Sequence, residues 1–265
     1  MPSSADLSGL DTTKLNLGEF AARFRGEAIA HNAVFSYFPA ALQFTAEDVR
    51  EVVEEPSQAL PASVLGAVGK IVLLFVPYLE RPAMKGKNTD FDAADCKISL
   101  DPPDRGVNMP VVYLAPSGPG VPHVLAFGVR DVDSTDYHYN FFYSVASLVF
   151  LGEPETVLAG YRNILREELK SRAHGEVDEP GWKAKLNMLN KETGVRGDTK
   201  LFREYARHSF IDTMTLYLHG ICCDIDVEPG PRQIASRYLR KRLQYLQIQY
   251  PQPEGYAVFP EELKN

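Results

Sequence analysis

The chain has 265 residues, of which 45% are hydrophobic and 24% are charged, and its formal net charge is −7. These values are typical of a soluble globular protein and exclude a mostly disordered chain, a collagen-like repeat and a polytopic membrane protein. An acidic protein repels the phosphate backbone, so nucleic acid is not an expected partner. The three cysteines, Cys96, Cys222 and Cys223, are too few for a disulfide framework and predict a reduced, cytoplasmic protein.

No targeting or membrane-spanning segment is predicted. Residues 1–11 are polar and lack the basic region and apolar run of a secretory signal. The most hydrophobic stretch, residues 64–79, is shorter than the ~20 residues of a spanning helix and contains Lys70 and Pro77. We therefore expect a soluble chain without a membrane span, in which residues 64–79 form a buried core helix that ends near Pro77.

The N-terminal part is predicted to be helical after a flexible arm at residues 1–13. Apolar residues recur with helical spacing over residues 16–38, where the aromatic side chains share one face: Phe20, Phe24, Phe35 and Phe38. Thr45 precedes an acidic helix at residues 46–55, with acidic side chains in its first turn. A third helix is expected over residues 58–79.

The composition changes in the middle of the chain. Residues 82–109 are rich in Lys, Gly, Asn, Asp and Pro, and they predict a long surface connection with a short strand at residues 97–100. Residues 111–115 and 123–130 predict two further strands. The Pro, Ser and Gly residues of positions 116–120 join these strands as an antiparallel hairpin.

The C-terminal half is predicted to be helical. Apolar residues recur with helical spacing in five segments that Gly and Pro residues separate: 136–151, 153–173, 179–191, 199–223 and 231–248. The tail, residues 250–265, contains three prolines and is expected to lie extended over the surface.

Together these elements predict a single α+β domain, residues 1–265, that is predominantly α-helical. We expect a bundle-like helical core with a small antiparallel sheet, about residues 97–130, inserted between the N- and C-terminal helices. Strands do not alternate with helices, so a doubly wound parallel sheet is disfavoured. The sequence contains no dinucleotide-binding, phosphate-loop, zinc-protease, serine-hydrolase or kinase motif.

Glu27 and His31 form the first candidate site. They lie four residues apart on the aromatic face of the predicted N-terminal helix. Helical bundles present metal ligands to their interior in this way, as a carboxylate and an imidazole close together on one helix face. The alternative is structural, because buried polar groups need partners. In that case Glu27 pairs with Arg23, and His31 hydrogen-bonds a backbone carbonyl.

His208 and Asp212 form a second pair with the same spacing, on the helix predicted at residues 199–223. His219 faces the same side but lies about 16 Å along the helix from His208, so one ion cannot bind both imidazoles. If the two pairs lie on neighbouring helices, they predict a site for divalent zinc, iron or manganese, with these ligands: Glu27, His31, His208 and Asp212. The alternative is a solvated polar face with ordinary i, i+4 pairs.

His138 is the predicted catalytic residue. It follows an acidic segment and shares a helix face with apolar side chains: Phe142, Val145 and Val149. A histidine near a helix N-terminus in apolar surroundings favours its neutral form, which suits a haem or metal ligand or a catalytic base. The acidic segment lacks the glycine and the final glutamate of an EF-hand loop. The alternative is a core histidine, with the aspartates as caps: Asp131, Asp133 and Asp136.

These observations lead to two hypotheses about function. The first is a soluble cytoplasmic enzyme that acts on a small molecule in a pocket between helices, with a divalent metal if the two ligand pairs converge. The second is a non-catalytic helical interaction or regulatory protein that binds a partner through its acidic body or its basic C-terminal helix. Residues 231–242 of that helix are expected to form a solvated basic face, since no recognition helix follows.

Overall fold

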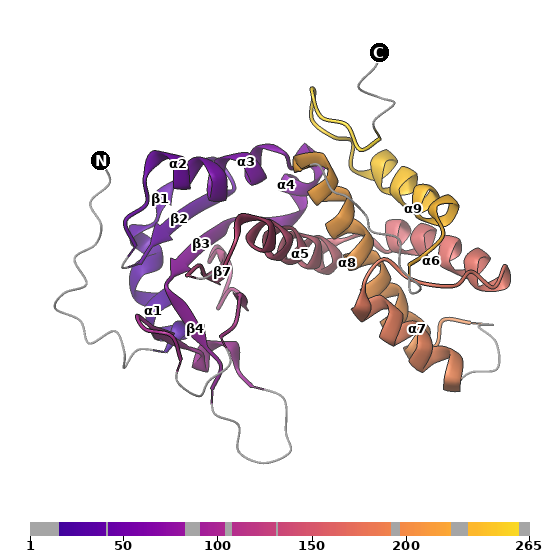
Figure 1. The fold of residues 1–265 in the computed structure, drawn as a ribbon, viewed down its shortest axis with the longest axis horizontal. Helices are drawn as coiled ribbons and strands as arrows, with labels where there is room; N and C mark the ends of the chain where they lie inside the picture. The colour runs from indigo at the N-terminus through magenta and orange to yellow at the C-terminus, as the bar shows by residue number, and fades with distance from the viewer. Residues whose placement is uncertain are drawn as a thin grey trace. The chain divides into compact units, whose positions relative to one another are not determined.

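The computed structural model describes residues 16–40, 42–82, 91–103, 108–130, 132–191, 197–223 and 233–259 (Figure 1). Contacts divide the chain into two compact units. The sheet unit comprises residues 1–58 and 69–140, and the helical unit comprises residues 59–68 and 141–265. Each unit is described by itself below.

The sheet unit contains a five-stranded mixed sheet with the order β1-β2-β3-β7-β6 (Figure 1). Its strands are β1 (Ile29–Ala30), β2 (Phe35–Pro39), β3 (Ile71–Val76), β6 (Val111–Leu114) and β7 (His123–Gly128). The predicted antiparallel hairpin of β6 and β7 is confirmed. A second, two-stranded antiparallel sheet pairs β4 (Tyr78–Glu80) with β5 (Lys97–Ser99). The expectation of only a small antiparallel sheet is wrong, because β3 pairs in parallel with both β2 and β7.

The prediction of a helix over residues 58–79 is mostly wrong. Only α4 (Ala62–Val68) is helical, and the chain then continues as β3 and β4. All six residues of β3 are buried, as in a central strand that is covered on both faces. A short, continuous apolar run fits a buried strand and a buried helix equally well, so periodicity alone could not distinguish them.

The two faces of the sheet bury different sets of side chains. Because side chains alternate along a strand, Phe38 and its parallel neighbour Leu74 share one face, on which α1 (Leu17–Phe24) packs. Phe75 and Phe127 lie on the opposite face. Their rings contact Tyr137, with centroids 6.0 and 5.0 Å from its ring.

The helix expected over residues 16–38 is also shorter than predicted. Helix α1 ends at Phe24, and a 3-10 turn, η2 (Arg25–Glu27), leads into the hairpin of β1 and β2. The Asn32 side chain accepts hydrogen bonds from the backbone N–H groups of Val34 and Phe35, at 2.9 and 2.8 Å. This side-chain turn offers the backbone an alternative to a helix. The aromatic residues still meet, but from a helix and a strand: the rings of Phe24 and Phe38 stack at 5.4 Å.

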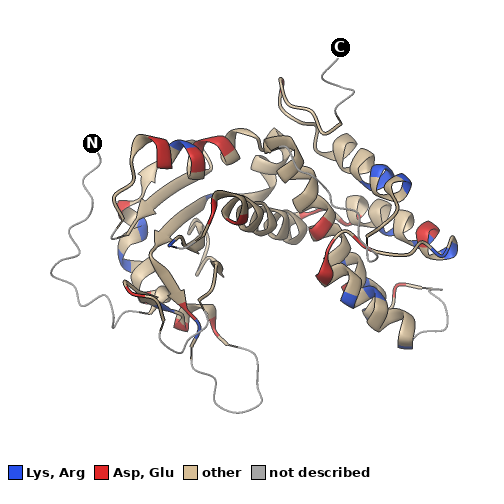
Figure 2. Cartoon of the chain, viewed as in Figure 1, with Lys and Arg blue, Asp and Glu red and all other residues tan. Residues whose placement is uncertain are grey.

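The acidic helix predicted at residues 46–55 is confirmed. It comprises α2 (Ala46–Val49), a π-helical segment η3 (Arg50–Glu54) and α3 (Glu55–Gln58). Thr45 and Asp48 form a capping box at its start, in which each side chain accepts a hydrogen bond from the backbone N–H of the other residue. Figure 2 shows the acidic residues gathered on this segment.

The helical unit matches the C-terminal predictions closely. Its helices are α4, the second part of α5 (Ser134–Gly152), α6 (Glu155–Lys170), α7 (Glu179–Lys191), α8 (Lys200–Cys222) and α9 (Ser236–Gln249). No single helix of the described residues is long and apolar enough to cross a membrane. Helices α5 and α6 pass that test only as a pair that is bent by 112°.

Some predicted segments lie partly outside the described residues. The arm at residues 1–13 lies outside them entirely. Of the connection at residues 82–109, the described part contains β5 and a 3-10 turn, η4 (Ala93–Asp95). Of the tail, residues 250–259 are described and contain no helix or strand.

Candidate functional site

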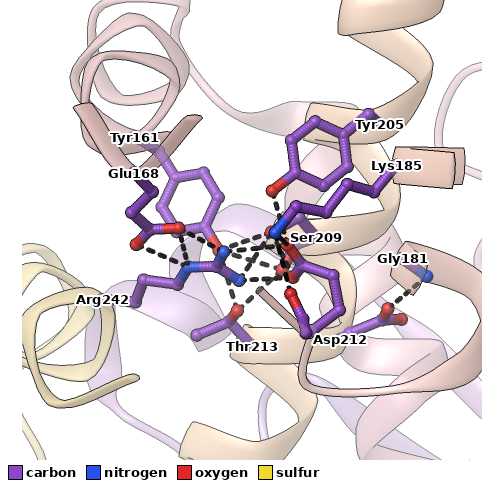
Figure 3. A network of polar contacts seen from close by, with 11 residues as sticks. Tyr161, Glu168, Gly181, Lys185, Tyr205, Ser209, Asp212, Thr213 and Arg242 are labelled. Atoms are coloured by element: carbon purple, nitrogen blue, oxygen red, sulfur yellow. Dashed lines mark hydrogen bonds and ion pairs between the residues drawn. The ribbon is translucent and has the colours of Figure 1, made fainter. Parts of the chain in front are cut away.

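The polar centre of the helical unit is the guanidinium of Arg242, on α9 (Figure 3). Its side chain is 0% exposed. The Nε and Nη2 atoms donate to the Glu168 carboxylate, with the closest approach at 2.5 Å. The Nη1 and Nη2 atoms donate to the Glu176 carboxylate at 2.7 and 3.1 Å, and Nη1 also donates to Ser209 Oγ at 2.9 Å. All five N–H groups of the guanidinium therefore have an acceptor.

Glu176 receives more donors than any other carboxylate of this network. Besides Arg242, the Lys185 ammonium donates to its Oε1 atom at 3.1 Å, and the Tyr205 hydroxyl donates to the same atom at 2.5 Å. Burial raises the pKa of Glu176, but the charge and hydrogen bonds of Arg242, together with Lys185 and Tyr205, outweigh it and lower the pKa to about 2. Glu176 is thus an anion at neutral pH.

The loop between α6 and α7 places Glu176 at this centre. Helix α6 ends in a Schellman motif: the Ala173 N–H bonds the Glu168 carbonyl, and the Arg172 N–H bonds the Leu169 carbonyl. Arg172 adopts the left-handed conformation, with φ of 55°. The Glu176 carbonyl then accepts the Ile234 N–H at 3.2 Å, which ties the loop to the segment before α9.

The charges in this network balance without Asp212. Arg242 and Lys185 supply two positive charges, and Glu168 and Glu176 supply two negative charges. Asp212, on α8, is 2% exposed, and the only hydrogen bond of its side chain to a described residue is accepted at Oδ2 from the Gly181 N–H, at 2.8 Å. Burial raises the pKa of Asp212 to about 7, although the Gly181 N–H opposes the shift.

Gly181 allows this contact because it has no side chain. A Cβ atom at this position would lie 2.6 Å from Oδ2 of Asp212. Within the described residues, the second carboxylate oxygen, Oδ1, has no hydrogen-bond partner. Asp212 is therefore a buried carboxyl that changes its protonation near neutral pH.

His208 lies one turn before Asp212 on α8. Its Nδ1 atom is buried and has no hydrogen-bond partner among the described residues. Burial and the positive charge of Arg207 lower its pKa, and Glu204 opposes the shift. The helix thus brings together the predicted pair, His208 and Asp212, both with a polar atom left unpaired. In the described part of the helical unit, no group of three His, Cys, Asp or Glu side chains that could share an ion includes this pair.

A separate cavity lies between α5, α6 and α8 of the helical unit. Its volume is about 100 Å³, and its lining combines apolar and aromatic side chains with arginines: Phe150, Leu158, Tyr161, Arg162, Arg203, Ala206, Arg207 and Phe210. The Tyr161 and Phe210 rings meet edge to face at 5.2 Å. The Tyr161 hydroxyl is directed to Ser209 and Thr213 and lies within 3.2 Å of both side-chain oxygens. Tyr161 therefore lines the cavity with its ring and not with its hydroxyl.

The cavity and the His208–Asp212 pair occupy opposite sides of α8. At about 100° per residue, His208 and Asp212 lie about 150° and 170° around the helix from the mean direction of its cavity-lining residues. A ligand in the cavity therefore does not reach either side chain. The two features are two distinct candidate sites.

The other predicted ligands, Glu27 and His31, lie in the sheet unit. Glu27 ends η2 and His31 follows β1, so they do not share a helix, and the spacing argument that paired them is lost. The His31 Nε2 donates to the Ser57 hydroxyl at 2.9 Å, and that hydroxyl donates to the Glu54 carbonyl. Their role as metal ligands remains a prediction without its geometric basis.

His138 is 8% exposed and belongs to the sheet-unit end of α5. Its Nε2 donates to the Glu51 carbonyl at 3.0 Å, and the neighbouring Tyr137 hydroxyl donates to the Val52 carbonyl at 2.6 Å. Both carbonyls belong to the π-helical segment η3. The alternative expectation, that the aspartates cap the helix, holds for Asp133, whose Oδ1 accepts the Asp136 N–H at 2.8 Å. Asp131 lies outside the described residues.

The basic side chains of the C-terminal helix do not all form the solvated face that the sequence predicts. Arg242 is buried, the exposed Lys241 pairs with Glu167 at 2.5 Å, and the Arg240 guanidinium lies 4.6 Å from the centroid of the Phe259 ring. Sequence analysis missed Arg242 because its neighbours are charged. One signal was present: Arg242 lies four residues before Leu246, and both side chains are buried on the same face of α9.

Comparison with family models, curated proteins and solved structures gives no match to the chain. The functional argument therefore depends on the geometry alone.

Proposed function

We propose that the protein binds a small organic molecule in the cavity between α5, α6 and α8 of the helical unit. The observation that carries the proposal is the apolar cavity of about 100 Å³ beside a fully hydrogen-bonded polar network. Ligand sites in proteins are mostly apolar clefts with a few polar groups that fix the orientation of the ligand. The network supports this role because it holds α6, α7, α8 and α9 together behind the cavity wall at Tyr161.

A binding experiment with cavity variants tests this proposal. Ala206 lines the cavity and is 6% exposed, so Ala206→Leu adds three carbon atoms to the cavity space. Leu158→Ala removes carbon atoms from its wall. We expect small organic probes such as pentanamide and pentanoate to perturb the NMR signals of α5, α6 and α8 in the wild-type protein. Ala206→Leu should abolish these changes, and Leu158→Ala should admit larger probes.

Leu189→Ala is the matched control, because Leu189 is 48% exposed on α7 and does not line the cavity. It removes the same atoms as Leu158→Ala and should leave the binding of every probe unchanged. Binding that persists in Ala206→Leu, or signals that change only elsewhere in the chain, would contradict the proposal.

A second candidate function is catalysis by a divalent metal bound to His208 and Asp212. The observation that favours it is the pair of unpaired buried atoms, Nδ1 of His208 and Oδ1 of Asp212, one turn apart on α8. Imidazole with carboxylate suits zinc, iron or manganese, and such an ion would act as a Lewis acid. Water or the substrate would complete its coordination.

Thermal melts with added metal test the second candidate. An ion that binds only the folded chain raises its stability by about 2.7 kcal/mol at a hundredfold excess over the dissociation constant. His208→Ala and Asp212→Asn should each remove the increment. His174→Ala should retain it, since His174 is an exposed residue of the α6–α7 loop. No bound metal and no shift with zinc, iron or manganese would exclude this candidate.

The alternative hypothesis of a non-catalytic interaction protein has less support at its basic helix. Two of the cations on which it depends, Lys241 and Arg242, are paired with carboxylates of α6 within the helical unit.

A further inference from the structure

We propose that the ligand of the cavity is a small organic anion, and that Arg203 and Arg207 hold its charged group. This inference rests on the proposed function of the cavity and adds the chemical class of the ligand. Three observations carry it: the pairing state of the arginines, their place on α8 and the apolar character of the rest of the cavity lining.

The three arginines that line the cavity differ in their partners. Arg162 is neutralised, because it pairs with Glu155 and lies 3.8 Å from Asp198. Arg203 and Arg207 are exposed, and among the described residues neither guanidinium has a hydrogen bond or an ion pair. Their guanidiniums therefore keep all their N–H donors available beside the cavity, in a chain whose net charge is −7.

The place of these two residues on α8 is unfavourable without an anion. Arg203 is the fourth residue of α8, near the helix N-terminus, where the helix dipole disfavours cations; Arg207 lies one turn further along, so the two like charges repel each other. Helix α8 has no acidic residue in its first turn to offset them. A bound carboxylate or phosphate would remove both conflicts, and a guanidinium recognises either group through paired N–H donors.

The apolar part of the cavity lining determines the orientation of the ligand. Phe150, Leu158 and Phe210 offer only apolar surface, and the Tyr161 hydroxyl already bonds Ser209 and Thr213. A polar end of the ligand would lose its hydrogen bonds with water there without replacement. The ligand must therefore place its apolar part against these apolar side chains and its anionic group at Arg203 and Arg207.

The volume limits the apolar part. An apolar cavity of ~150 Å³ is known to hold benzene. The volume of about 100 Å³ is smaller and suits a short aliphatic chain or a small ring. Short-chain organic acids and short alkyl phosphate esters share this chemistry.

Matched probes test the inference. Pentanoate, butyl phosphate, pentanamide and pentylammonium have similar chains and differ in the charge of the head group. We expect pentanoate or butyl phosphate to bind at least tenfold more tightly than pentanamide, and pentylammonium not to bind. Arg203→Gln and Arg207→Gln should each weaken the anion at least fivefold without changing the affinity for pentanamide. The stronger of the two anionic probes identifies the head group.

Arg237→Gln is the control, because Arg237 is an exposed arginine of α9 that does not line the cavity. It should leave all affinities unchanged. If pentanamide binds as tightly as both anions, the cavity function stands and the anion inference is wrong. If no probe binds, the proposed function itself fails, and this inference fails with it.

Discussion

Replacement of Arg242 by Met perturbs the polar centre of the helical unit most directly. The change removes the hydrogen bonds from the guanidinium to Glu168, Glu176 and Ser209, and leaves a methionine side chain in their place. Glu176 keeps Lys185 and Tyr205 as partners. Glu168 is 2% exposed and has no other hydrogen-bonded side chain among the described residues, so it becomes an uncompensated buried charge.

The expected loss follows from this geometry. Breaking a buried ion pair by removing one partner costs about 3–5 kcal/mol, because the other charge remains without compensation. The double variant Arg242→Met, Glu168→Gln should recover at least about 1 kcal/mol, since a neutral amide replaces the orphaned carboxylate. Lys241→Met is the matched control on the same helix. Its pair with Glu167 is more than half exposed at both residues and contributes little to stability, because water screens it.

Urea unfolding at pH 7 measures these differences through the fluorescence of Trp182. The chain contains a single tryptophan, and it lies on α7, so the signal reports the helical unit. A loss for Arg242→Met no larger than that for Lys241→Met would refute the reasoning. So would a double variant that is less stable than Arg242→Met alone.

Three further predictions concern single residues. The pKa of Asp212 is about 7 in the folded chain against 3.8 for the free side chain, so the free energy of unfolding should fall as pH rises from about 4 to 7. Asp212→Asn should lack this decline when urea unfolding is measured across that range. An equal dependence of the unfolding free energy on pH in both proteins would contradict the prediction. Arg172→Gly should raise the unfolding free energy by about 0.5–1 kcal/mol, because glycine adopts the left-handed conformation without strain; a lower urea midpoint would contradict this. All three cysteine thiols should react with a thiol reagent in urea. In the native protein Cys96, which is 0% exposed, should react slowest, and rapid labelling of Cys96 would contradict its burial.

The helices of the helical unit could be predicted from the sequence because their ends carry local signals. The predicted segment 199–223 corresponds to α8, Lys200–Cys222, which the Thr199 side chain caps by accepting the Phe202 N–H. The segment 179–191 agrees with α7 at both ends. These signals lie within a few residues of each boundary.

The sheet could not be predicted in the same way, because its order depends on contacts between distant residues. Ile71 pairs with Phe35 on one side and with His123 on the other. Nothing in the run of β3 itself distinguishes such a central strand from a buried helix. The hairpin of β6 and β7 was predictable because turn residues lie between its strands.

The candidate sites likewise combine features that the local sequence predicts with features that depend on contacts between distant residues. The spacing of His208 and Asp212 on a helix was visible in the sequence, but the residue whose N–H donates to the Asp212 carboxyl, Gly181, is 31 residues away. Arg242 and Glu176 are 66 residues apart. The cavity exists only after α5, α6 and α8 pack together. Its one local signal is the pair Arg203 and Arg207, like charges at a spacing that an isolated helix disfavours.

The central claim, that a small molecule occupies the cavity, is tested most directly by intermolecular nuclear Overhauser effects between bound pentanoate and the protein. The account predicts contacts from the terminal methyl group of pentanoate to the ring protons of Phe150 and Phe210, which line the cavity. These contacts should be absent in Ala206→Leu. Bound pentanoate whose methyl group contacts neither ring, or contacts that persist in Ala206→Leu, would contradict the claim.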